Sequence, residues 1–346
     1  MNFAKELTDW YLVYKRDLPW RATRDPYRIW LSEIILQQTR VTQGSPYYFR
    51  FLERFPDVES LAAASEEEVL KLWQGLGYYS RARNLLFTAR HVVTELGGRF
   101  PSNYKELLRL KGVGDYTASA IASVCYGEAE AAVDGNVFRV LARIFGISTP
   151  INTPAGFKVF KQLAQRLMDH EDPGNFNQAL IEFGSEQCRP RQPLCPNCIF
   201  KTSCKAYQQD RIAELPVKKK GKKIRKRHFN YLVMVDSAGR TYLEQRKGKG
   251  IWEGLYEFPL VETSGAVSRE NLINEKAFRQ HQGSGSMNPV RYNPQPIVHK
   301  LTHQHIHTTF WICCCEKLPS RSLSREEVNN LPVPVLIEKF IGKFEF

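Results

Sequence analysis

Apolar residues recur at intervals of three and four positions from the N-terminus to about residue 205, with short breaks at Pro or Gly. This spacing places apolar side chains along one face of an α-helix. The clearest predicted helices are 3–14, 67–73, 82–96, 136–145 and 157–168. The pattern therefore predicts an all-α N-terminal domain.

A different pattern begins after residue 228. Short runs rich in β-branched and aromatic residues, separated by turn residues, are typical of strands, and they occur at Phe229–Val235, Thr241–Gln245 and Thr308–Cys314. We therefore predict a second domain of α/β type. The fold class is α+β, with more than one domain.

The segment 216–228 joins the two patterns and is strongly basic, because eight of its 13 residues are Lys or Arg. Such a run cannot pack into a core and is expected to be a solvated linker, which could also lie along phosphates. The predicted organisation is a helical domain at 1–215, a basic linker at 216–228 and a second domain at 229–346.

Composition and charge narrow the class of protein. The 346 residues are 42% hydrophobic and 25% charged, as in soluble globular proteins, and no apolar run is long enough to span a bilayer. The N-terminus has no signal-peptide pattern, so we expect a cytoplasmic protein without a membrane partner. The net charge of +13 favours a polyanionic partner, with nucleic acid before acidic membrane, although many basic proteins bind neither specifically.

Four of the eight cysteines lie close together, with the spacing Cys188-x6-Cys195-x2-Cys198-x5-Cys204. Four thiolates at this density suit one soft metal centre. Zinc sites usually contain two C-x2-C pairs, and this run contains one. The spacing therefore favours an iron–sulfur cluster in a compact loop, 188–204, over the alternative of structural zinc.

A glycine-containing turn, Lys111–Gly112–Val113–Gly114, separates the predicted helical stretch 104–110 from a helix that starts near Asp115. Gly112 and Gly114 are expected to adopt positive φ and to expose backbone N–H groups beside the positive end of the next helix. This arrangement suits a phosphate without any contact to a base. The alternative is an ordinary turn between helices that ends in a glycine cap.

Glu33 stands in the apolar run Ile29–Leu36, which Asp25 is expected to cap and Pro26 to open as a helix. A carboxyl group among apolar neighbours has a raised pKa and stays protonated. A protonated carboxyl can act as the general acid that a purine leaving group requires. The alternative is that Glu33 lies on the exposed face of an amphipathic helix.

Asp134 follows the apolar residues 131–133 and precedes a predicted helix, so helix capping is its simplest role. The positive end of that helix is expected to keep the carboxylate ionised. An anion here could stabilise an oxocarbenium ion. One carboxyl group with a raised pKa, Glu33, and one with a lowered pKa, Asp134, is the division between acid and base seen in sugar hydrolysis.

Several motifs together carry a family resemblance. The segments 32–41, 73–84, 110–117 and 133–137 and the cysteine loop resemble, in the same order, those of the MutY adenine DNA glycosylases. The loop is similar to the [4Fe–4S] loop of endonuclease III and MutY proteins, and 110–117 is similar to their helix–hairpin–helix. The segment 249–259 resembles the Nudix-like C-terminal domain of MutY proteins.

This resemblance implies the fold and the roles of individual residues. It implies a helix–hairpin–helix glycosylase domain with a [4Fe–4S] cofactor, followed by a Nudix-like domain. Glu33 would protonate adenine and assist water, and Asp134 would stabilise the cation. The other implied roles are reaction geometry for Tyr116 and Asn136, adenine contact for Arg21 and Gln178, and insertion into the base stack for Gln38 and Tyr78. From the residues alone, Tyr78 could equally belong to a core.

In MutY proteins the C-terminal domain reads 8-oxoguanine with a Phe-Ser-His loop. The matching residues here are Leu301, Thr302 and His303, so only the histidine is unchanged. Thr302 keeps a hydroxyl group and Leu301 keeps apolar bulk, so we expect lesion recognition to survive. The acidic Nudix signature is not visible between residues 260 and 290, which disfavours pyrophosphate cleavage.

Tyr116 distinguishes between two related chemistries. Endonuclease III-like enzymes have at this position a lysine that forms a Schiff base and breaks the strand, which tyrosine cannot do. We therefore predict a monofunctional adenine DNA glycosylase. It would act as a monomer, on the nucleoid, upon double-stranded DNA with adenine opposite 8-oxoguanine or guanine. The alternatives are an endonuclease III-like glycosylase/AP lyase and a non-catalytic iron–sulfur DNA-binding sensor.

Overall fold

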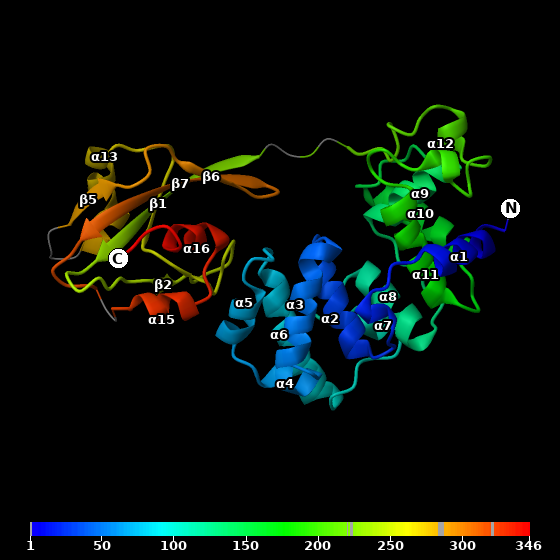
Figure 1. Ribbon diagram of the computed structural model, residues 1–346, viewed down its shortest axis with the longest axis horizontal. Coiled ribbons are helices and arrows are strands. Elements are labelled where there is room, and N and C mark those ends of the chain that lie inside the picture. The colour runs from blue at the N-terminus through cyan, green and yellow to red at the C-terminus, as the bar shows by residue number, and fades with distance from the viewer. Residues whose placement is uncertain (1, 220, 222–223, 283–286, 320–321) are drawn as a thin grey trace. The chain divides into compact units, whose positions relative to one another are not determined.

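The computed structural model describes residues 2–219, 221, 224–282, 287–319 and 322–346 (Figure 1). The chain forms two compact units, and each is described by itself. Unit 1 comprises Met1–Ala63 and Asn84–Lys220, and unit 2 comprises Ala64–Arg83 and Gly221–Phe346. None of the helices in the described part of the chain is long and apolar enough to cross a membrane.

Unit 1 is helical, as the apolar spacing predicts. Its α-helices are α1 (Phe3–Tyr14), α2 (Pro26–Leu36), α3 (Val41–Arg54), α4 (Val58–Ala63), most of α6 (Ser80–Leu96), α7 (Tyr104–Leu107), α8 (Asp115–Tyr126), α9 (Gly135–Phe145), α10 (Pro154–Leu167), α11 (Pro173–Glu182) and α12 (Lys205–Gln208). Short 3-10 helices cover Pro19–Arg21 and Cys195–Asn197, and a π-helical turn covers Phe183–Gln187.

Local sequence signals set the starts of the helices that carry the site. Asp25 accepts a hydrogen bond from the backbone N–H of Tyr27, and Pro26 occupies the first turn of α2. Asp134 caps α9 in the same way, through the backbone N–H groups of Asn136 and Val137. These side chains satisfy backbone donors that have no partner within the helix. Asp134 is itself a residue of the predicted active site, and the helix that Asp25 caps carries Glu33.

Aromatic side chains fill the core between α1, α9 and α11. Phe3 stacks on Phe200 with ring centroids 4.9 Å apart, and Trp10 meets Phe183 edge to face at the same distance. Phe176, in α11, is fully buried in this cluster. Packing of this kind fixes the orientation of a helix more firmly than intrinsic propensity does. The side chains that α1 and α11 direct at one another are therefore held in place.

Unit 2 is built on a mixed sheet. Its elements are α5 (Glu66–Trp73), β1 (Arg225–Val235), β2 (Glu244–Gln245), β3 (Tyr256–Glu257), β4 (Leu260–Thr263), α13 (Arg269–Asn274), α14 (Lys276–Gln282), β5 (Asn288–Arg291), β6 (Ile297–Lys300), β7 (Gln304–Cys314), α15 (Arg325–Asn330) and α16 (Val335–Ile341). The main sheet has the order β4-β1-β7-β5, and β6 also pairs with β7. β1 and β7 are parallel, with Arg225 opposite Gln304.

Alternate residues of β7 face opposite sides of the sheet, as strand geometry requires. Phe310 stacks on Phe340 of α16 with centroids 4.0 Å apart. Its neighbour Trp311 packs instead in a buried cluster with Leu272 of α13 and Phe278 of α14. Helices therefore cover both faces of the sheet, α16 on one face and α13 with α14 on the other (Figure 1).

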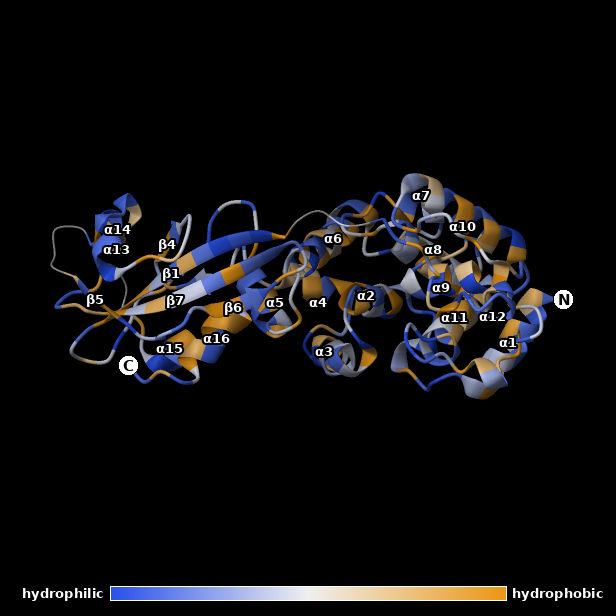
Figure 2. Cartoon of the chain, turned by 90° about the horizontal axis from the view of Figure 1, so that it is seen from above, coloured by the Kyte–Doolittle hydropathy of each residue, from blue (hydrophilic) through white to orange (hydrophobic). Residues whose placement is uncertain are grey.

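The predicted C-terminal boundary of the linker 216–228 is wrong. Arg225–His228 are the first four residues of β1, and their backbone pairs with β7 from Gln304 to His307. The hydrophilic colour at the start of β1 in Figure 2 marks these residues. A strand gains its hydrogen bonds from the neighbouring strand and needs no apolar side chains at its end. Lys220, Lys222 and Lys223 of the same run lie outside the described residues.

The division of the chain also differs from the predicted boundary. Residues 64–83, expected in the helical domain, pack with the C-terminal part of the chain in unit 2. Lys71 donates hydrogen bonds to the carbonyl groups of Asn329 and Leu331, and Arg83 forms an ion pair with Glu253 at 3.0 Å. These contacts join residues that are far apart in sequence, so no local pattern could predict them.

Candidate active site and cysteine cavity

A cavity of about 790 Å³ opens in unit 1 at the ends of α2, α8, α9 and α11. This volume is within the range of small-molecule sites, about 300–1,000 Å³. Seven of the residues singled out in the sequence line it, namely Arg21, Glu33, Gln38, Tyr116, Asp134, Asn136 and Gln178. They come from five separate segments, so the fold brings together residues that the sequence only indicates one by one.

Glu33 and Tyr116 form a hydrogen-bonded pair on the wall of the cavity. Burial raises the pKa of Glu33 to about 7, the hydrogen bond from Tyr116 lowers it, and the nearby charge of Asp134 raises it further. The expected direction of this pKa shift is therefore confirmed. Burial also raises the pKa of Tyr116 well above its usual value, so its phenol remains a hydrogen-bond donor.

Asp134 accepts hydrogen bonds from the backbone N–H groups of Asn136 and Val137 at 2.8 and 2.9 Å, and from Nδ2 of Asn136 at 2.7 Å. The expected lowering of its pKa is wrong. Burial raises the pKa of Asp134, although these hydrogen bonds and the charge of Arg139 lower it. The cost of removing this carboxylate from water outweighs the stabilisation at the start of the helix.

Asn136 is itself fixed on its far side. Nη2 of Arg139 donates to Oδ1 of Asn136 at 2.8 Å and to the carbonyl of Gly184 at 2.7 Å. Gly184 leaves room for this arrangement, because a Cβ atom there would lie 2.6 Å from Cβ of Asn136. The amide of Asn136 therefore has one orientation, with its nitrogen toward Asp134.

Two arginines at the cavity are held by a buried acid that the sequence reasoning did not single out. Glu182 is fully buried and accepts three hydrogen bonds from Arg16, at 2.6–2.9 Å, and one from Arg21 at 2.7 Å. Burial acts to raise its pKa, but these hydrogen bonds dominate and lower the pKa to about 2. The signal that could have revealed Glu182 is a lone acidic residue in an apolar helical run, as for Glu33.

Gln38 lines the same cavity and has a left-handed backbone conformation, with φ of +56°. Non-glycine residues rarely adopt this conformation, and it is concentrated at functional sites. Gln38 follows the last turn of α2, the helix that carries Glu33. The same helix therefore positions the acid and a strained polar residue at the rim.

The predicted glycine turn differs in one respect from expectation. Gly112 has a φ of +81°, and a Cβ atom there would lie 2.9 Å from Cβ of Asn84. Gly114 has a φ of −94° and is extended, because it is the residue that precedes α8, so the prediction of positive φ is wrong there. The carbonyl of Lys111 accepts a hydrogen bond from Thr88 at 2.8 Å, and Val113 is buried, which anchors the turn.

In unit 2, two predicted lesion contacts lie side by side. The hydroxyl groups of Tyr78 and Thr302 are hydrogen bonded at 2.5 Å. Tyr78 is 47% exposed and has a φ of +47°, so it does not belong to a core. Thr302 and His303 are exposed in the tight turn between β6 and β7, which a hydrogen bond from the N–H of Leu301 to the carbonyl of Gln304 closes.

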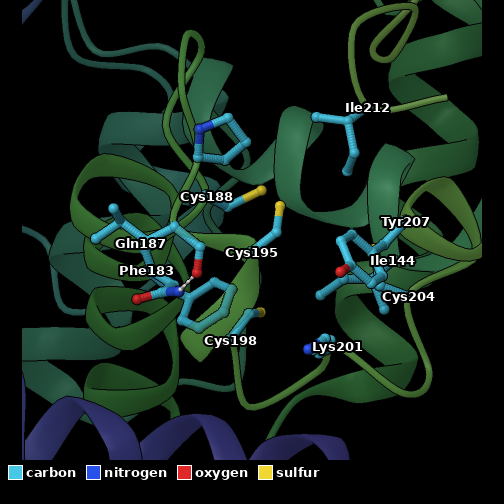
Figure 3. A pocket seen from close by; sticks show the side chains of 12 residues that line it. Ile144, Phe183, Gln187, Cys188, Cys195, Cys198, Lys201, Cys204, Tyr207 and Ile212 are labelled. Atoms are coloured by element: carbon cyan, nitrogen blue, oxygen red, sulfur yellow. Dashed lines mark hydrogen bonds between the residues drawn. The ribbon is translucent and has the colours of Figure 1, made fainter. Parts of the chain in front are cut away.

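The four cysteines of the predicted metal loop line one cavity in unit 1, with apolar neighbours such as Ile144 and Leu194. Figure 3 shows the sulfur atoms of Cys188 and Cys195 pointing toward each other, with Cys198 and Cys204 on other parts of the wall. Among the described residues, no three His, Cys, Asp or Glu side chains surround a position for one metal ion.

Arg143 places a buried positive charge beside this cavity. Its Nη1 lies 3.5 Å from Sγ of Cys188, and the rest of its guanidinium group binds the carbonyl groups of Arg189, Pro190 and Leu215. Burial raises the pKa of Cys195, and the charge of Arg143 acts to lower it, so the arginine favours the thiolate form that binds metals. Four thiols that can bind a soft metal, beside one buried positive charge, therefore fit a soft group that carries negative charge.

Comparison with known proteins agrees with this fold and site. Residues 31–166 match the HhH-GPD superfamily of base excision DNA repair proteins, and residues 230–343 match the NUDIX domain. A solved structure of a thermostable thymine-DNA glycosylase is 34% identical, with a TM-score of 0.56, over 60% of this chain and 95% of that one. The helical fold and the carboxyl-lined cavity thus define a DNA repair protein of the HhH-GPD superfamily.

Two curated relatives show which family of this superfamily the chain belongs to. An adenine DNA glycosylase of Rattus norvegicus is 33% identical, over 99% of this chain and 78% of the relative. One of Buchnera aphidicola subsp. Baizongia pistaciae is 30% identical, over 96% of this chain and 94% of the relative. The chain belongs to the adenine DNA glycosylase family.

Proposed function

We propose that this protein hydrolyses the N-glycosidic bond of an adenine that has been flipped out of duplex DNA opposite 8-oxoguanine or guanine. The observation that carries the proposal is the pair of partly buried carboxyl groups, Glu33 and Asp134, in one cavity of about 790 Å³. A purine leaves its sugar readily only after protonation, and the remaining sugar is positively charged. The cavity provides an acid that can protonate the purine and a carboxylate that can stabilise the positively charged sugar.

Glu33 is the general acid in this proposal. With a pKa of about 7 it holds a proton at neutral pH and can still release it, which is the condition for efficient general acid catalysis. Tyr116 fixes the position of the carboxyl group by its hydrogen bond. Glu33 gives its proton to N7 of adenine, and the resulting carboxylate then accepts a proton from the attacking water.

Asp134 stabilises the oxocarbenium ion. Burial raises the pKa of Asp134, and its three hydrogen bonds and the charge of Arg139 limit this rise and favour the anionic form. An oriented carboxylate in a site of low dielectric constant interacts strongly with a developing positive charge. Asn136 keeps the carboxylate oriented through its own contact with Arg139.

The reaction stops after release of the base. A lyase would need an amine to form a Schiff base with the sugar, and no lysine is among the described residues that line the cavity. Lys161 is the nearest lysine to the start of α8, but Asp115, Ser119 and the carbonyl of Ala131 hold its Nζ atom at 2.7–3.1 Å. This supports a monofunctional glycosylase over an endonuclease III-like lyase or a non-catalytic sensor.

Double-stranded DNA is the partner in this proposal, and the protein acts as a monomer. The backbone N–H groups around Gly112 would bind a phosphate, and the net charge of +13 would attract the duplex. Gln38 would insert beside the flipped adenine. Tyr78, Leu301, Thr302 and His303 would contact the 8-oxoguanine strand, and an exposed hydroxyl pair is suited to hydrogen bonds with a base edge.

The cysteine cavity would hold a [4Fe–4S] cluster. In such a cluster each cysteine binds a different iron, so the sulfur atoms need not converge on one point, whereas zinc requires all four at about 2.3 Å from one ion. Cys188, Cys195, Cys198 and Cys204 would be the ligands, and the buried charge of Arg143 would offset part of the negative charge. The cluster would order the basic loop.

Replacement of one ligand tests this cluster. Cys198→Ser is expected to purify with less than a quarter of the iron and sulfide of the unchanged chain, because a hydroxyl group is a poor ligand for a soft metal. Cys125→Ser is the matched control, since Cys125 lies in α8 away from the cavity. Zinc in place of iron and sulfide, or full iron content in Cys198→Ser, would refute the assignment.

The proposed activity is tested by single-turnover excision from duplexes with adenine opposite 8-oxoguanine or guanine. Glu33→Gln and Asp134→Asn should bind both duplexes with unchanged affinity and release adenine at least about 100-fold more slowly. Glu53→Gln, at an exposed position on α3, is the control and should keep full activity. An active Glu33→Gln enzyme, or strand cleavage without added alkali, would contradict the proposal.

A further inference from the structure

Gln178 reaches the cavity from α11, and a buried tyrosine of α1 holds it from behind. The phenolic hydroxyl of Tyr11 donates a hydrogen bond to Oε1 of Gln178 at 2.6 Å. Tyr11 is 1% exposed and does not line the cavity, whereas Gln178 does. The two residues are 167 positions apart in sequence, and the packing of α1 on α11 brings them together.

This hydrogen bond fixes which end of the amide faces the base. Because Oε1 is bound to Tyr11, the NH2 group of Gln178 is left to point into the cavity. Rotation of the amide by half a turn would place its NH2 group, which cannot accept a hydrogen bond, opposite the hydroxyl of Tyr11. An unsatisfied buried donor is costly, so the rotated form is disfavoured.

Three other polar side chains at the cavity also offer donors. Glu182 holds the guanidinium groups of Arg16 and Arg21, which carry only N–H donors, and protonated Glu33 offers an O–H group. A base is therefore favoured when the ring nitrogen that faces these donors has a free lone pair, and disfavoured when that nitrogen carries a proton. Adenine has a lone pair at N1 on its Watson–Crick edge, whereas guanine and hypoxanthine have an N–H group there.

We propose that Tyr11 is a specificity-determining positioning residue, which holds the Gln178 amide with its NH2 group toward N1 of the flipped base and so selects adenine over purines with a protonated N1. Tyr11 does not touch the base and acts only through Gln178. This inference rests on the proposed adenine excision.

The test compares excision of adenine and of hypoxanthine, each placed opposite 8-oxoguanine, under single-turnover conditions. Hypoxanthine keeps N7, so protonation by Glu33 is available to both bases. Tyr11→Phe should slow adenine release by about tenfold, because the freed amide no longer presents a fixed donor. Hypoxanthine release should stay the same or increase, so the ratio of the two rates should fall by about tenfold or more.

Two further variants separate this role from a general loss of structure. Tyr14→Phe, on the same helix at an exposed position, should leave the ratio unchanged. Gln178→Leu should lower the ratio, and adding Tyr11→Phe to it should have no further effect, because Tyr11 acts through the amide. Circular dichroism melting checks that Tyr11→Phe is folded.

The outcomes distinguish this inference from the proposed function. One outcome is that the unchanged protein releases adenine rapidly while Tyr11→Phe slows the release of adenine and hypoxanthine equally. That result overturns only the role of Tyr11. Equal release of adenine and hypoxanthine by the unchanged protein also overturns it. Failure of the unchanged protein to release adenine from any duplex overturns the proposed function itself.

Discussion

The pKa of Glu33 depends on burial and on two neighbouring side chains. Burial in α2 raises its pKa, the phenol of Tyr116 lowers it, and the carboxylate of Asp134 raises it again. The resulting pKa of about 7 lies above that of an ordinary carboxyl group, yet low enough for Glu33 to ionise near neutral pH. A general acid with this pKa has its protonation state set within the physiological range.

The pH dependence of excision should report this pKa. The acid must be protonated, so the single-turnover rate constant should be highest below pH 7 and fall about tenfold per pH unit well above it. Tyr116→Phe removes the hydrogen bond that lowers the pKa of Glu33. The midpoint of the profile should therefore move to higher pH in Tyr116→Phe.

Tyr126→Phe, at the other end of α8, is the control and should keep the midpoint of the unchanged protein. A midpoint that stays in place in Tyr116→Phe, or moves to lower pH, would mean that the tyrosine does not stabilise the ionised form of Glu33. A rate constant that rises with pH through 7 would assign Glu33 the role of a base instead.

At the scale of elements, α11 supports one wall of the cavity through residues one turn apart. Gln178 and Glu182 are four positions apart, so they lie on the same face of the helix. Gln178 faces Tyr11 of α1, and Glu182 faces Arg16 and Arg21 in the segment after it. The contact between α11 and this N-terminal segment therefore positions each group that would meet the base on that side.

Loss of the buried charge at Glu182 should destabilise this contact. Glu182→Gln leaves Arg16 and Arg21 without their carboxylate, and breaking a buried ion pair from one side typically costs about 3 kcal/mol in the free energy of unfolding. Chemical denaturation at pH 7 measures this loss. Excision should also slow, because Arg21 loses its fixed position.

The effect should disappear in acid, which identifies its electrostatic origin. The pKa of Glu182 is lowered from 4.5 to about 2 in the folded protein, so its stabilising contribution is complete above pH 4.5 and is lost as the pH falls toward 2. The unchanged protein should therefore approach the stability of Glu182→Gln over that interval. Glu186→Gln, at a more exposed ion pair with Arg16, should cost less than about 1 kcal/mol; an equal cost would contradict the argument.

At the scale of the whole molecule, the proposed function assigns base excision and lesion reading to different units. The paired carboxyl groups and the four cysteines lie in unit 1, whereas Tyr78 and Thr302 share unit 2. The segment 64–83, which precedes most of α6 in sequence, belongs to the second unit. A residue from the helical part of the sequence is thereby hydrogen bonded to the turn between β6 and β7.

The sequence by itself determined the helical class of the first part, the strands of the second and most of the polar side chains that line the cavity. Helix α1 spans the predicted residues 3–14, and Asp25 and Asp134 cap the helices that they were expected to cap. These features depend on spacing and on hydrogen bonds between near neighbours, which a local pattern records. The motif resemblance added the roles that we propose for Glu33 and Asp134.

Only the tertiary structure decided which of these groups meet and in what charge state. Burial of Asp134 raises a pKa that its position before a helix was expected to lower. Arg16 at the cavity, and Tyr11 and Glu182 behind its wall, are held by contacts that span more than 160 residues of sequence. Desolvation and long-range hydrogen bonds depend on what surrounds a group in space, and neighbours along the chain do not specify that.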